Sequence, residues 1–464
     1  MGHADELQKG IAWRDGRGKR RAVEGIANDY LAILWRFACR VPPDQRPHGV
    51  AACDERRGDV PPKVAGSAGN EDAMRHGRFL DSDFVDTYVS ERRSDFGSRL
   101  MHIAFIAPPF ISVPPITYGG TELFIAHLAN ELHSRGHRVT VYANGDSRLG
   151  CELKWRYRHG DWPVVDDCAA QLKNADHTAW AIRDAARSAD LIHTNDIVAI
   201  PFTTCVDRPV VHTLHHPHEP ALSEQYVRYP AVRYVAISAF QARREPMRDI
   251  DVVHHGLPLS DYTFRAQKQD YLAFLGRFAP CKGAHLAIDI ARRAGLPLKL
   301  AGEIQPTFRD YWERDVAPRI DGDAIEYVGE VDGPRKNELL SHARALLFPI
   351  QWNEPFGLVM IEALACGTPV LALPGGSVSE IIVNGRNGWI CRDVDEMAER
   401  AVALSIPAQA CRACVAEHFS CERMADRYLE VYDRAAGGHH DLVVDHRESS
   451  AGNGGRSYSI IVSR

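Results

Sequence analysis

From residue 102 onward, short apolar runs alternate with amphipathic helical stretches, and this alternation constrains the fold more than any other feature of the chain. A first series of apolar runs lies at 102–107, 138–143, 191–194, 209–214, 233–238 and 251–256. Continuous apolar runs of this length are typical of strands buried on both faces, as in parallel sheets whose strands are joined by crossover helices. We therefore predict an open α/β domain over residues 101–257.

A second series of apolar runs follows a polar interruption at 257–270. These runs lie at 271–276, 298–302, 325–329, 345–349 and 369–373. A chain of 464 residues is too long for a single core. We predict an α/β protein with two Rossmann-like, doubly wound domains that face each other across a cleft, the second over residues 258–420. Ligands of such sheets bind at the carboxyl ends of the strands.

The two ends of the chain lack this alternation. Residues 1–100 are rich in charged residues, Gly and Pro, and only the stretch 22–39 has helical apolar spacing. Nothing in these residues could bury a core large enough to offset the cost of ordering the chain. We predict that they are disordered, or that they are translated from a start upstream of the true one, because Met101 opens a buried strand at once. Residues 437–464, rich in Gly, Ser and His, are predicted to form a loose tail.

Composition excludes several classes of function. A formal net charge of −6 and scattered Lys and Arg give no reason to expect nucleic acid as a partner. The 11 cysteines lack zinc-site spacing apart from the isolated pair Cys411 and Cys414, so we interpret them as reduced thiols of a cytosolic protein. No apolar stretch reaches the roughly 20 residues that span a bilayer, and we reject residues 30–39 as a signal peptide. We expect a cytoplasmic protein and leave open peripheral contact with the inner face of the membrane.

The stretch 354–372 holds a charge where burial is costly. Glu362 interrupts an apolar helical pattern that Glu354 precedes. Pro355 suits a first helical position, so we predict that the helix starts there or one residue on. The amides of Phe356, Gly357 and Leu358 would then form an anion site suited to phosphate. Glu354 would lie at the lip of the site and Glu362 deeper, each gripping hydroxyl groups of one ligand; the alternative is that Glu362 pairs with an Arg.

Two further motifs follow predicted strands. Arg277 and Lys282 lie just after the run 271–276, where two cations can neutralise a diphosphate leaving group. Gly119 and Gly120 follow the first strand and open a helix, so they allow an anion to approach the backbone closely.

In order and spacing, these motifs make residues 101 to about 436 resemble the retaining glycosyltransferases of family four, which have the GT-B fold. The resemblance rests on GGTE at 119–122, HTLHHP at 212–217, GRFAPCKG at 276–283, EPFGLVMIE at 354–362 and GGSVSEIIVNGRNG at 375–388. Within the family, the chain is most similar to the bacterial subgroup of avilamycin and cell-surface glycan assembly. The resemblance also implies that residues 421–436 form a helix that returns to brace the first domain.

The resemblance assigns a role to each motif residue. It implies that Glu362 holds the ribose and Glu354 the donor sugar, and that Gly357 and Leu358 bind the diphosphate. Arg277 and Lys282 would stabilise the charge that develops on the diphosphate. Three further positions follow from it: His215 near the reacting centre, Gly120 at phosphate or acceptor, and Glu380 near the base or ribose. For the role of His215, its neighbours His212 and His216 remain alternatives. The histidine cluster could instead bind a metal together with His218 and Glu219.

The predicted function is sugar transfer from a nucleotide diphosphate sugar to a hydroxyl acceptor, without a metal or other cofactor. Metal-dependent transferases of another fold use Asp-x-Asp, but this chain carries that pattern at 81, 249, 321 and 393, none of them at the predicted cleft. The acceptor is predicted to be a sugar, a lipid-linked molecule or a small molecule; the oligomeric state is left open. A nucleotide-sugar epimerase or glucan phosphorylase of related architecture, or a protein that only binds nucleotide sugars, are the alternatives.

Overall fold

A computed structural model describes residues 100–117, 119–164 and 168–437. These described residues belong to one compact unit. The predictions of a disordered or mis-started segment at 1–100 and of a loose tail at 437–464 fall, apart from residues 100 and 437, outside the described residues.

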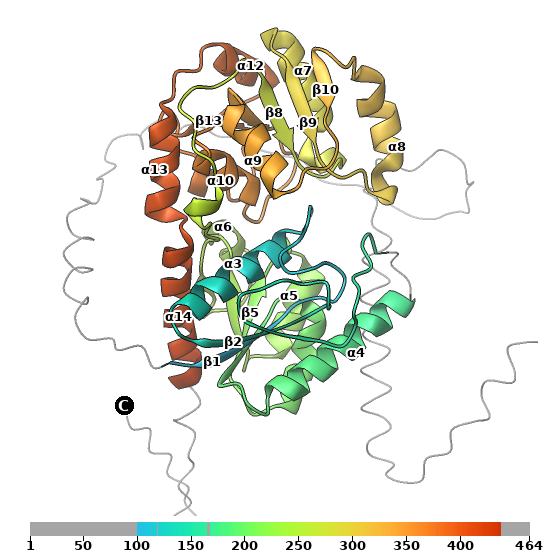
Figure 1. Cartoon of the computed structure of the whole chain (residues 1–464), viewed down its shortest axis with the longest axis vertical. Helices are drawn as coiled ribbons and strands as arrows, with labels where there is room; N and C mark the ends of the chain where they lie inside the picture. Colours follow the sequence, from blue (N-terminus) through green and yellow to red (C-terminus); the bar gives the residue numbers. More distant parts are fainter. Residues whose placement is uncertain (1–99, 118, 165–167, 438–464) are drawn as a thin grey trace, which may run out of the picture. The chain divides into compact units, whose positions relative to one another are not determined.

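The first part of this unit is a seven-stranded parallel sheet (Figure 1). Its strand order is β3-β2-β1-β4-β5-β6-β7. The strands are β1 (His102–Ile106), β2 (Arg138–Ala143), β3 (Glu152–Trp155), β4 (Leu191–Thr194), β5 (Val210–Leu214), β6 (Arg233–Ala236) and β7 (Asp251–Val252). The helices that connect them are α3 (Gly120–Ser134), α4 (Cys168–Ala185), α5 (Pro220–Arg228) and α6 (Ala239–Ala242).

The second part is a six-stranded parallel sheet with the strand order β10-β9-β8-β11-β12-β13. The strands are β8 (Leu272–Leu275), β9 (Leu298–Ala301), β10 (Ile325–Tyr327), β11 (Ala345–Phe348), β12 (Val370–Ala372) and β13 (Gly388–Ile390). The helices are α7 (Ala284–Ala294), α8 (Arg309–Tyr311), α9 (Gly333–His342), α10 (Leu358–Ala365), α11 (Val378–Ile381), α12 (Val394–Val402) and α13 (Ala408–His418).

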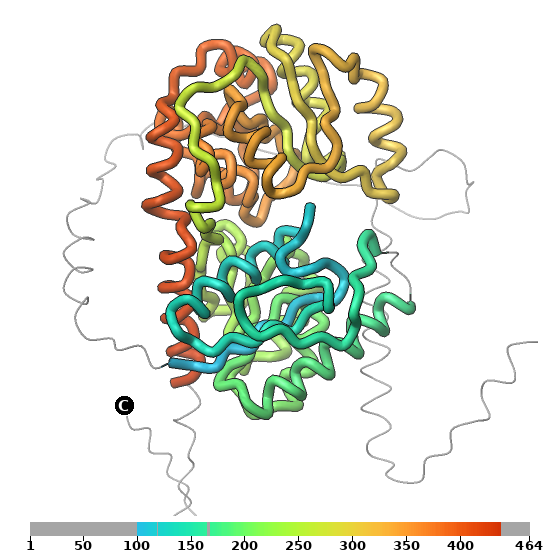
Figure 2. The backbone as a smooth tube through the Cα atoms, viewed as in Figure 1, coloured from blue at the N-terminus to red at the C-terminus, as the bar shows by residue number. Residues whose placement is uncertain are grey.

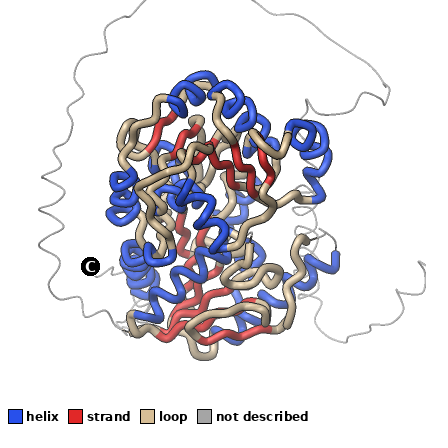
Figure 3. Tube along the Cα trace, turned by 45° about the horizontal axis from the view of Figure 1, so that its top comes forward, coloured by secondary structure: helices blue, strands red, loops and turns tan. Residues whose placement is uncertain are grey.

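Both faces of each sheet are buried, which explains the continuous apolar runs of the sequence. In β8, Ala273 packs in a core with α10 and α13, whereas Leu272 and Phe274 pack in a second core with α7 and α12. In β1, Ile103 and Phe105 face α3, and Ala104 and Ile106 face α4. The helices and strands are distinguished by colour in Figure 3.

The last helix, α14 (Cys421–Gly437), packs on the first sheet although it follows the second in sequence (Figure 2). Its residues Met424, Tyr428 and Tyr432 share a core with α3 and with β1, β2 and β5. The hydroxyl groups of Tyr432 and Tyr428 bond to His193 Nδ1 at 2.8 Å and to Thr213 Oγ1 at 2.9 Å. These polar contacts inside an apolar core fix the position of the helix.

The chain passes from the first part to the second and back at adjacent positions. The backbone N–H of Leu257 donates to the carbonyl of Phe419 at 2.8 Å, and that of Cys421 donates to the carbonyl of Leu257 at 3.0 Å. Gly256 lies so close to the returning segment that a Cβ there would be 2.2 Å from the carbonyl oxygen of Ser420. The two crossings are therefore held together by backbone contact.

Each sheet has a point at which the strand order reverses, and ligands of such sheets bind beside it. In the first sheet the reversal lies between β1 and β4, and in the second between β8 and β11. The segment that follows β1 contains Gly119 and Gly120. The segments that follow β8 and β11 contain Arg277, Lys282 and Glu354. These five predicted site residues thus lie after strands that flank the two points, whereas His215 follows β5 and Glu380 follows β12.

All eleven predicted strands are present, most of them one or two residues shorter than predicted. The sequence missed β3 and β13, which lie at the edges of their sheets. β3 has two exposed and two half-buried residues, so its sequence ELKW lacks an apolar run. Among the described residues, the structure contains no helix that is long and apolar enough to cross a membrane.

Candidate active site

The segments after β8 and β11 are tied together through their backbones. The N–H of Gln351 donates to the carbonyl of Cys281 at 2.8 Å. Gly283, with φ of 75°, approaches Pro349 so closely that a Cβ would be 2.1 Å from its carbonyl oxygen. These contacts set where Lys282 and Glu354 lie relative to each other.

The helix that holds Glu362 begins later than predicted. Helix α10 starts at Leu358, and Gly357 precedes it as the N-cap residue with φ of 84°. The prediction of a start at Pro355 or Phe356 is wrong, because the left-handed conformation of Gly357 interrupts a helical path through 355–357. The N–H of Met360 donates to the carbonyl of Gly357 at 2.9 Å. The amides of Leu358 and Val359 come before this bond and are placed to bind an anion.

Phe356 contributes its side chain to the core and not to an anion site. The ring is 2% exposed and lies in the core on the α10 side of the second sheet. Its centroid is 4.9 Å from that of His255. The anion role predicted for the Phe356 amide stays a prediction, and the helix start now favours Leu358 for it.

Glu354 is buried and paired with Lys282. Lys282 Nζ lies 2.6 Å from Glu354 Oε2, and Trp352 Nε1 donates to the same oxygen at 2.8 Å. The Lys282 ammonium also lies 4.5 Å from the centroid of the Trp352 ring. The structure therefore brings together Glu354, predicted to bind the donor sugar, and Lys282, predicted to bind the diphosphate.

Glu362 is also buried, at 4% exposure, and it is paired with a lysine. Lys336 Nζ lies 2.5 Å from Glu362 Oε1, and the Tyr262 hydroxyl donates to that oxygen at 3.2 Å. Burial and the nearby Glu362 raise the pKa of Tyr262 well above its usual value, so it remains a hydroxyl donor. The partner is thus a lysine, where the sequence-based alternative named an arginine.

Arg277 has an unusual environment for a cation. Its Nε is buried and bonds to none of the described residues, and its guanidinium carbon lies 5.9 Å from the centroid of the Phe308 ring. The Phe278 N–H donates to the carbonyl of Glu303 at 2.9 Å, which pins the Arg277 segment to the loop after β9. A buried donor without a partner is costly, so an anionic ligand that accepts from it would be bound favourably.

Gly119 and Gly120 lie at the start of α3. Gly119, with φ of 146°, is the N-cap residue, and a Cβ on it would be 2.9 Å from Glu122 Oε2. A Cβ on Gly120 would be 3.6 Å from Leu358 Cδ1, so the starts of α3 and α10 are neighbours. Burial raises the pKa of Glu122 to about 7, and the charge of Asp196 adds to the effect.

The structure separates the three neighbouring histidines. His212 is 2% exposed and bonds through Nδ1 to Thr194 Oγ1 at 2.9 Å, whereas His216 is exposed. His215 follows β5, and its Nε2 bonds to Asn195 Oδ1 at 3.0 Å. Its ring is stacked on His255, with centroids 5.8 Å apart. Burial, with His255 nearby, lowers the pKa of His215 well below its usual value, so the ring is neutral.

Glu380 accepts hydrogen bonds from the start of α6, which precedes the passage of the chain from the first sheet to the second. Its two oxygens accept from the N–H groups of Ala239 and Phe240 at 2.8 and 2.6 Å. His254 Nε2 lies 2.9 Å from Glu380 Oε2. Burial alone would raise the pKa of this carboxyl group, but the bonds from His254, Phe240 and Ala239 lower it overall. The predicted role of Glu380 at the base or ribose stays a prediction, beside this observed contact.

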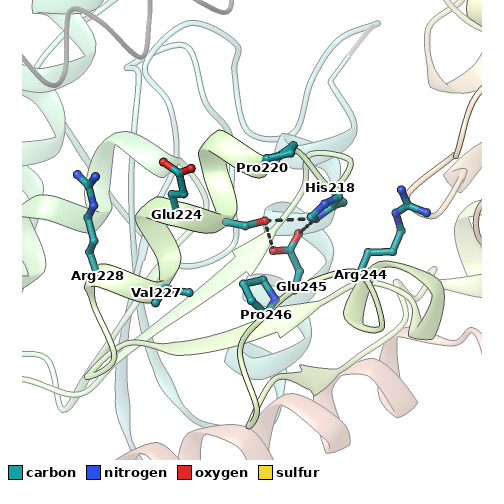
Figure 4. Close-up of a pocket in the computed structure, with 9 residues that line it drawn as sticks. His218, Pro220, Glu224, Val227, Arg228, Arg244, Glu245 and Pro246 are labelled. Carbon is teal, nitrogen blue, oxygen red and sulfur yellow. Dashed lines mark hydrogen bonds and ion pairs between the residues drawn. The ribbon is translucent and has the colours of Figure 1, made fainter. Parts of the chain in front are cut away.

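A surface pocket of about 620 Å³ lies along α5 (Figure 4). Among the residues that line it, His218 Nδ1 lies 3.2 Å from both Glu245 Oε1 and Ser223 Oγ, and Ser223 Oγ donates to Glu245 Oε2 at 2.6 Å. A hydrolytic relay needs Ser and the acid on opposite ring nitrogens, so this trio is not arranged as one. Arg228 and Arg244 lie at opposite ends of the group drawn.

Within the described ranges, no group of three or more His, Cys, Asp and Glu side chains gathers in a way that could hold a metal. The Asp-x-Asp residues there have local roles. Asp251 pairs with Arg233 and Arg434, Asp321 accepts from the N–H groups of its own turn, and Asp393 caps α12. The pattern at 81 lies outside the described residues.

Sequence reasoning missed three side chains that contact the predicted site: Trp352, Lys336 and Tyr262. Lys336 and Tyr262 come from distant segments, and no local pattern points to their pairing with Glu362. Trp352 lies only two residues before Glu354, so the sequence could have indicated a contact between the two side chains.

Two family models match the chain. The model "Glycosyltransferase Family 4" matches residues 118–261, and the model "Glycosyl transferases group 1" matches residues 261–406. Together they span 118–406, more than half of the 464 residues.

Curated relatives and solved structures agree with these matches. Glycogen synthase of Mycobacterium tuberculosis (strain ATCC 25618 / H37Rv) is 25% identical over 69% of this chain and 92% of its own length. D-inositol 3-phosphate glycosyltransferase of Rhodococcus erythropolis (strain PR4 / NBRC 100887) is 28% identical over 68% and 87%. AviGT4, a glycosyltransferase involved in avilamycin A biosynthesis, has a TM-score of 0.56 at 23% identity over 73% and 98%. Anabaena HepE, solved with UDP-glucose, has a TM-score of 0.58 at 18% identity over 72% and 100%. The two solved structures show the fold.

Gly376 is predicted to be essential for the position of Glu354. It has φ of 59°, and a Cβ there would be 2.0 Å from the Glu354 carbonyl oxygen. We expect Gly376→Ala to lower the free energy of unfolding by about 3 kcal/mol, from backbone strain and overlap together. Gly322→Ala is the matched control, because Gly322 has φ of 81° but open space around it; strain alone should cost about 1–2 kcal/mol. Urea unfolding measures both variants. If Gly376→Ala and Gly322→Ala lose the same free energy of unfolding, the close approach of Gly376 to Glu354 is not important for stability.

The contact of Glu380 predicts a pH dependence. The folded-state pKa of Glu380 is lowered from the usual 4.5, so its contribution to stability is fully present above that value and is lost as the pH falls through the folded-state pKa. We expect the stability difference between wild type and Glu380→Gln to be constant near neutral pH and to shrink below about pH 4.5. Urea unfolding at a series of pH values measures it, and a difference that stays constant in acid would refute the ionised contact.

Proposed function

The chain belongs to the glycosyltransferases that these two family models describe, and from this premise we propose that it is a retaining, metal-independent enzyme. It moves a sugar from a nucleoside diphosphate sugar to a hydroxyl-bearing acceptor. The observation that carries the proposal is Arg277, a half-buried residue that follows β8 beside the strand reversal of the second sheet and whose buried Nε has no partner among the described residues.

The diphosphate is the part of the donor that fits these cations. A guanidinium binds phosphate oxygens through two parallel N–H bonds, and Lys282 adds a second positive charge five residues further along the same segment. The amides of Leu358 and Val359 point from the start of α10, where the helix dipole also favours an anion. These groups supply the charge stabilisation that a divalent cation provides in other transferases.

The two buried carboxylates suit the two sugars of the donor. Carboxylate oxygens accept hydrogen bonds from vicinal hydroxyl groups, and Glu362 and Glu354 lie one turn inside α10 and four residues before it. We assign the ribose to Glu362 and the transferred sugar to Glu354. Each is already paired with a lysine, which holds the carboxylate in place for a ligand.

His215 is proposed to lie near the reacting centre as a neutral acceptor. With Asn195 Oδ1 as the acceptor, the ring proton is on Nε2 and the lone pair on Nδ1. A neutral imidazole can accept a hydrogen bond from a sugar hydroxyl group, and its lowered pKa keeps a second positive charge away from an oxocarbenium-like centre.

The chemical step breaks the bond between the anomeric carbon and the diphosphate oxygen. The diphosphate leaves with the electron pair, and Arg277 and Lys282 stabilise its charge. The acceptor hydroxyl attacks from the face that the diphosphate left, and its proton passes to a leaving-group phosphate oxygen. The new glycosidic bond therefore keeps the anomeric configuration, and no protein nucleophile is required.

Substitution of Glu362 tests the nucleotide assignment. UDP, GDP and ADP are screened by thermal shift, because a ligand bound only by the folded state stabilises it. We expect Glu362→Gln to lose at least about tenfold in affinity for the nucleoside diphosphate, from the loss of charge-assisted bonds to the ribose. Glu354→Gln should bind the bare nucleoside diphosphate like wild type and lose the added affinity for the nucleotide sugar.

Glu245→Gln is the matched control. Its side chain is 2% exposed and bonded to His218 and Ser223, so it tests the effect of removing a buried carboxylate elsewhere. Unchanged nucleotide affinity in Glu362→Gln would show that the carboxylate is structural. Donor binding without turnover in EDTA would favour a binding protein or a metal-dependent enzyme, and an epimerised donor would favour an epimerase.

A further inference from the structure

Trp352 contacts both members of the Lys282–Glu354 pair. Its indole Nε1 donates to Glu354 Oε2 at 2.8 Å, and its ring face lies 4.5 Å from Lys282 Nζ. A side chain that holds an anion through its N–H edge and a cation through its face uses both polar properties of an indole. The resemblance to known enzymes assigns no role to this residue.

The backbone around Trp352 is fixed independently of its side chain. A Cβ on Gly375 would be 2.5 Å from the carbonyl oxygen of Trp352, so the glycine pair 375–376 packs directly on this segment. On the other side, the bond from Gln351 to Cys281 ties it to the Lys282 segment. The indole is therefore held at a defined place between the two loops of the site.

The two bonds to Glu354 fall on one oxygen. Lys282 and Trp352 both reach Oε2, whereas no hydrogen bond from a described residue reaches Oε1. A carboxylate oxygen has two lone pairs, so Oε2 is filled and Oε1 keeps both acceptor sites. Lys282 has three N–H groups, one of which Glu354 takes. The remaining ones are left for a second anion beside the first.

We propose that Trp352 is a positioning residue of the donor site, which orients Glu354 Oε1 toward the transferred sugar, directly through its N–H and indirectly by holding Lys282 against the same carboxylate. The inference rests on the proposed function, because that function assigns the transferred sugar to Glu354. It adds that Trp352 contributes to recognition of the sugar and not of the nucleotide.

Two substitutions separate the two contacts. Trp352→Phe keeps a ring face for Lys282 and removes the N–H donor, whereas Trp352→Leu removes both. The affinities of wild type and variants are measured by calorimetry for UDP, GDP and ADP and for the corresponding nucleotide sugars, and kcat and KM are measured for hydrolysis of the donor. The ratio of the two affinities isolates the contribution of the sugar.

We expect the affinity for bare nucleoside diphosphate to change by less than about threefold in both variants. The ratio of nucleotide-sugar affinity to nucleotide affinity, and kcat/KM, should each fall about tenfold in Trp352→Phe, because one bond to a charged group is lost. Both should fall further in Trp352→Leu. Trp389→Phe is the matched control, because Trp389 also stacks on a cation, Arg400, at 3.8 Å, but lies at β13. Trp389→Phe should leave the ratio of nucleotide-sugar affinity to nucleotide affinity unchanged for each nucleotide.

The outcomes separate this inference from the function on which it rests. If wild type binds donors but Trp352→Leu keeps the wild-type sugar contribution, the inference is overturned and the function stands. If Trp352→Leu loses nucleotide and nucleotide sugar affinity equally, together with stability, Trp352 is structural and the inference is overturned. Wild-type protein that binds none of the donors overturns both.

Discussion

The burial of two carboxylates beside two lysines is the constraint on which the site depends. Glu354 and Glu362 are 7% and 4% exposed, and a carboxylate is removed from water at a high cost unless a cation and further donors accompany it. Lys282 and Trp352 do this for Glu354, and Lys336 and Tyr262 for Glu362. Removing one partner leaves an uncompensated charge, so each carboxylate and its lysine act as a unit.

The backbone makes this burial possible. The segments after β8 and β11 approach each other at Gly283 and Pro349, and Gly376 approaches Glu354 from the segment after β12. Parallel strands deliver these segments to one edge of the sheet, beside the reversal of strand order. The same sheet topology in the first part places Gly119 after β1 and His215 after β5, and α14 completes the core beneath them. The fold therefore explains why residues from five segments of sequence, those after β1, β5, β8, β11 and β12, lie near the two strand reversals.

Much of the fold could be predicted from the sequence, because strands buried on both faces leave continuous apolar runs. Edge strands leave no such run, which is why β3 and β13 were missed. The start of α10 was misplaced because Pro355 suits a helix start locally, whereas the conformation of Gly357 is set by its neighbours in the tertiary structure. The site residues were named mainly from the resemblance to a family. Their partners were not, since Lys336 and Tyr262 meet Glu362 only through folding, and Glu380 meets Ala239 and Phe240 in the same way.

We propose that the groups after β8 and β11 together bind one nucleoside diphosphate sugar. A crystal structure with the nucleoside diphosphate that stabilises the protein most tests it directly. We expect the ribose hydroxyls to bond to Glu362 and the diphosphate to lie between the Arg277 guanidinium and the amides of Leu358 and Val359. Lys282 should lie within reach of both the phosphate and Glu354. A nucleotide bound elsewhere, or one bound here with Glu362 still bonded only to Lys336 and Tyr262, would contradict it.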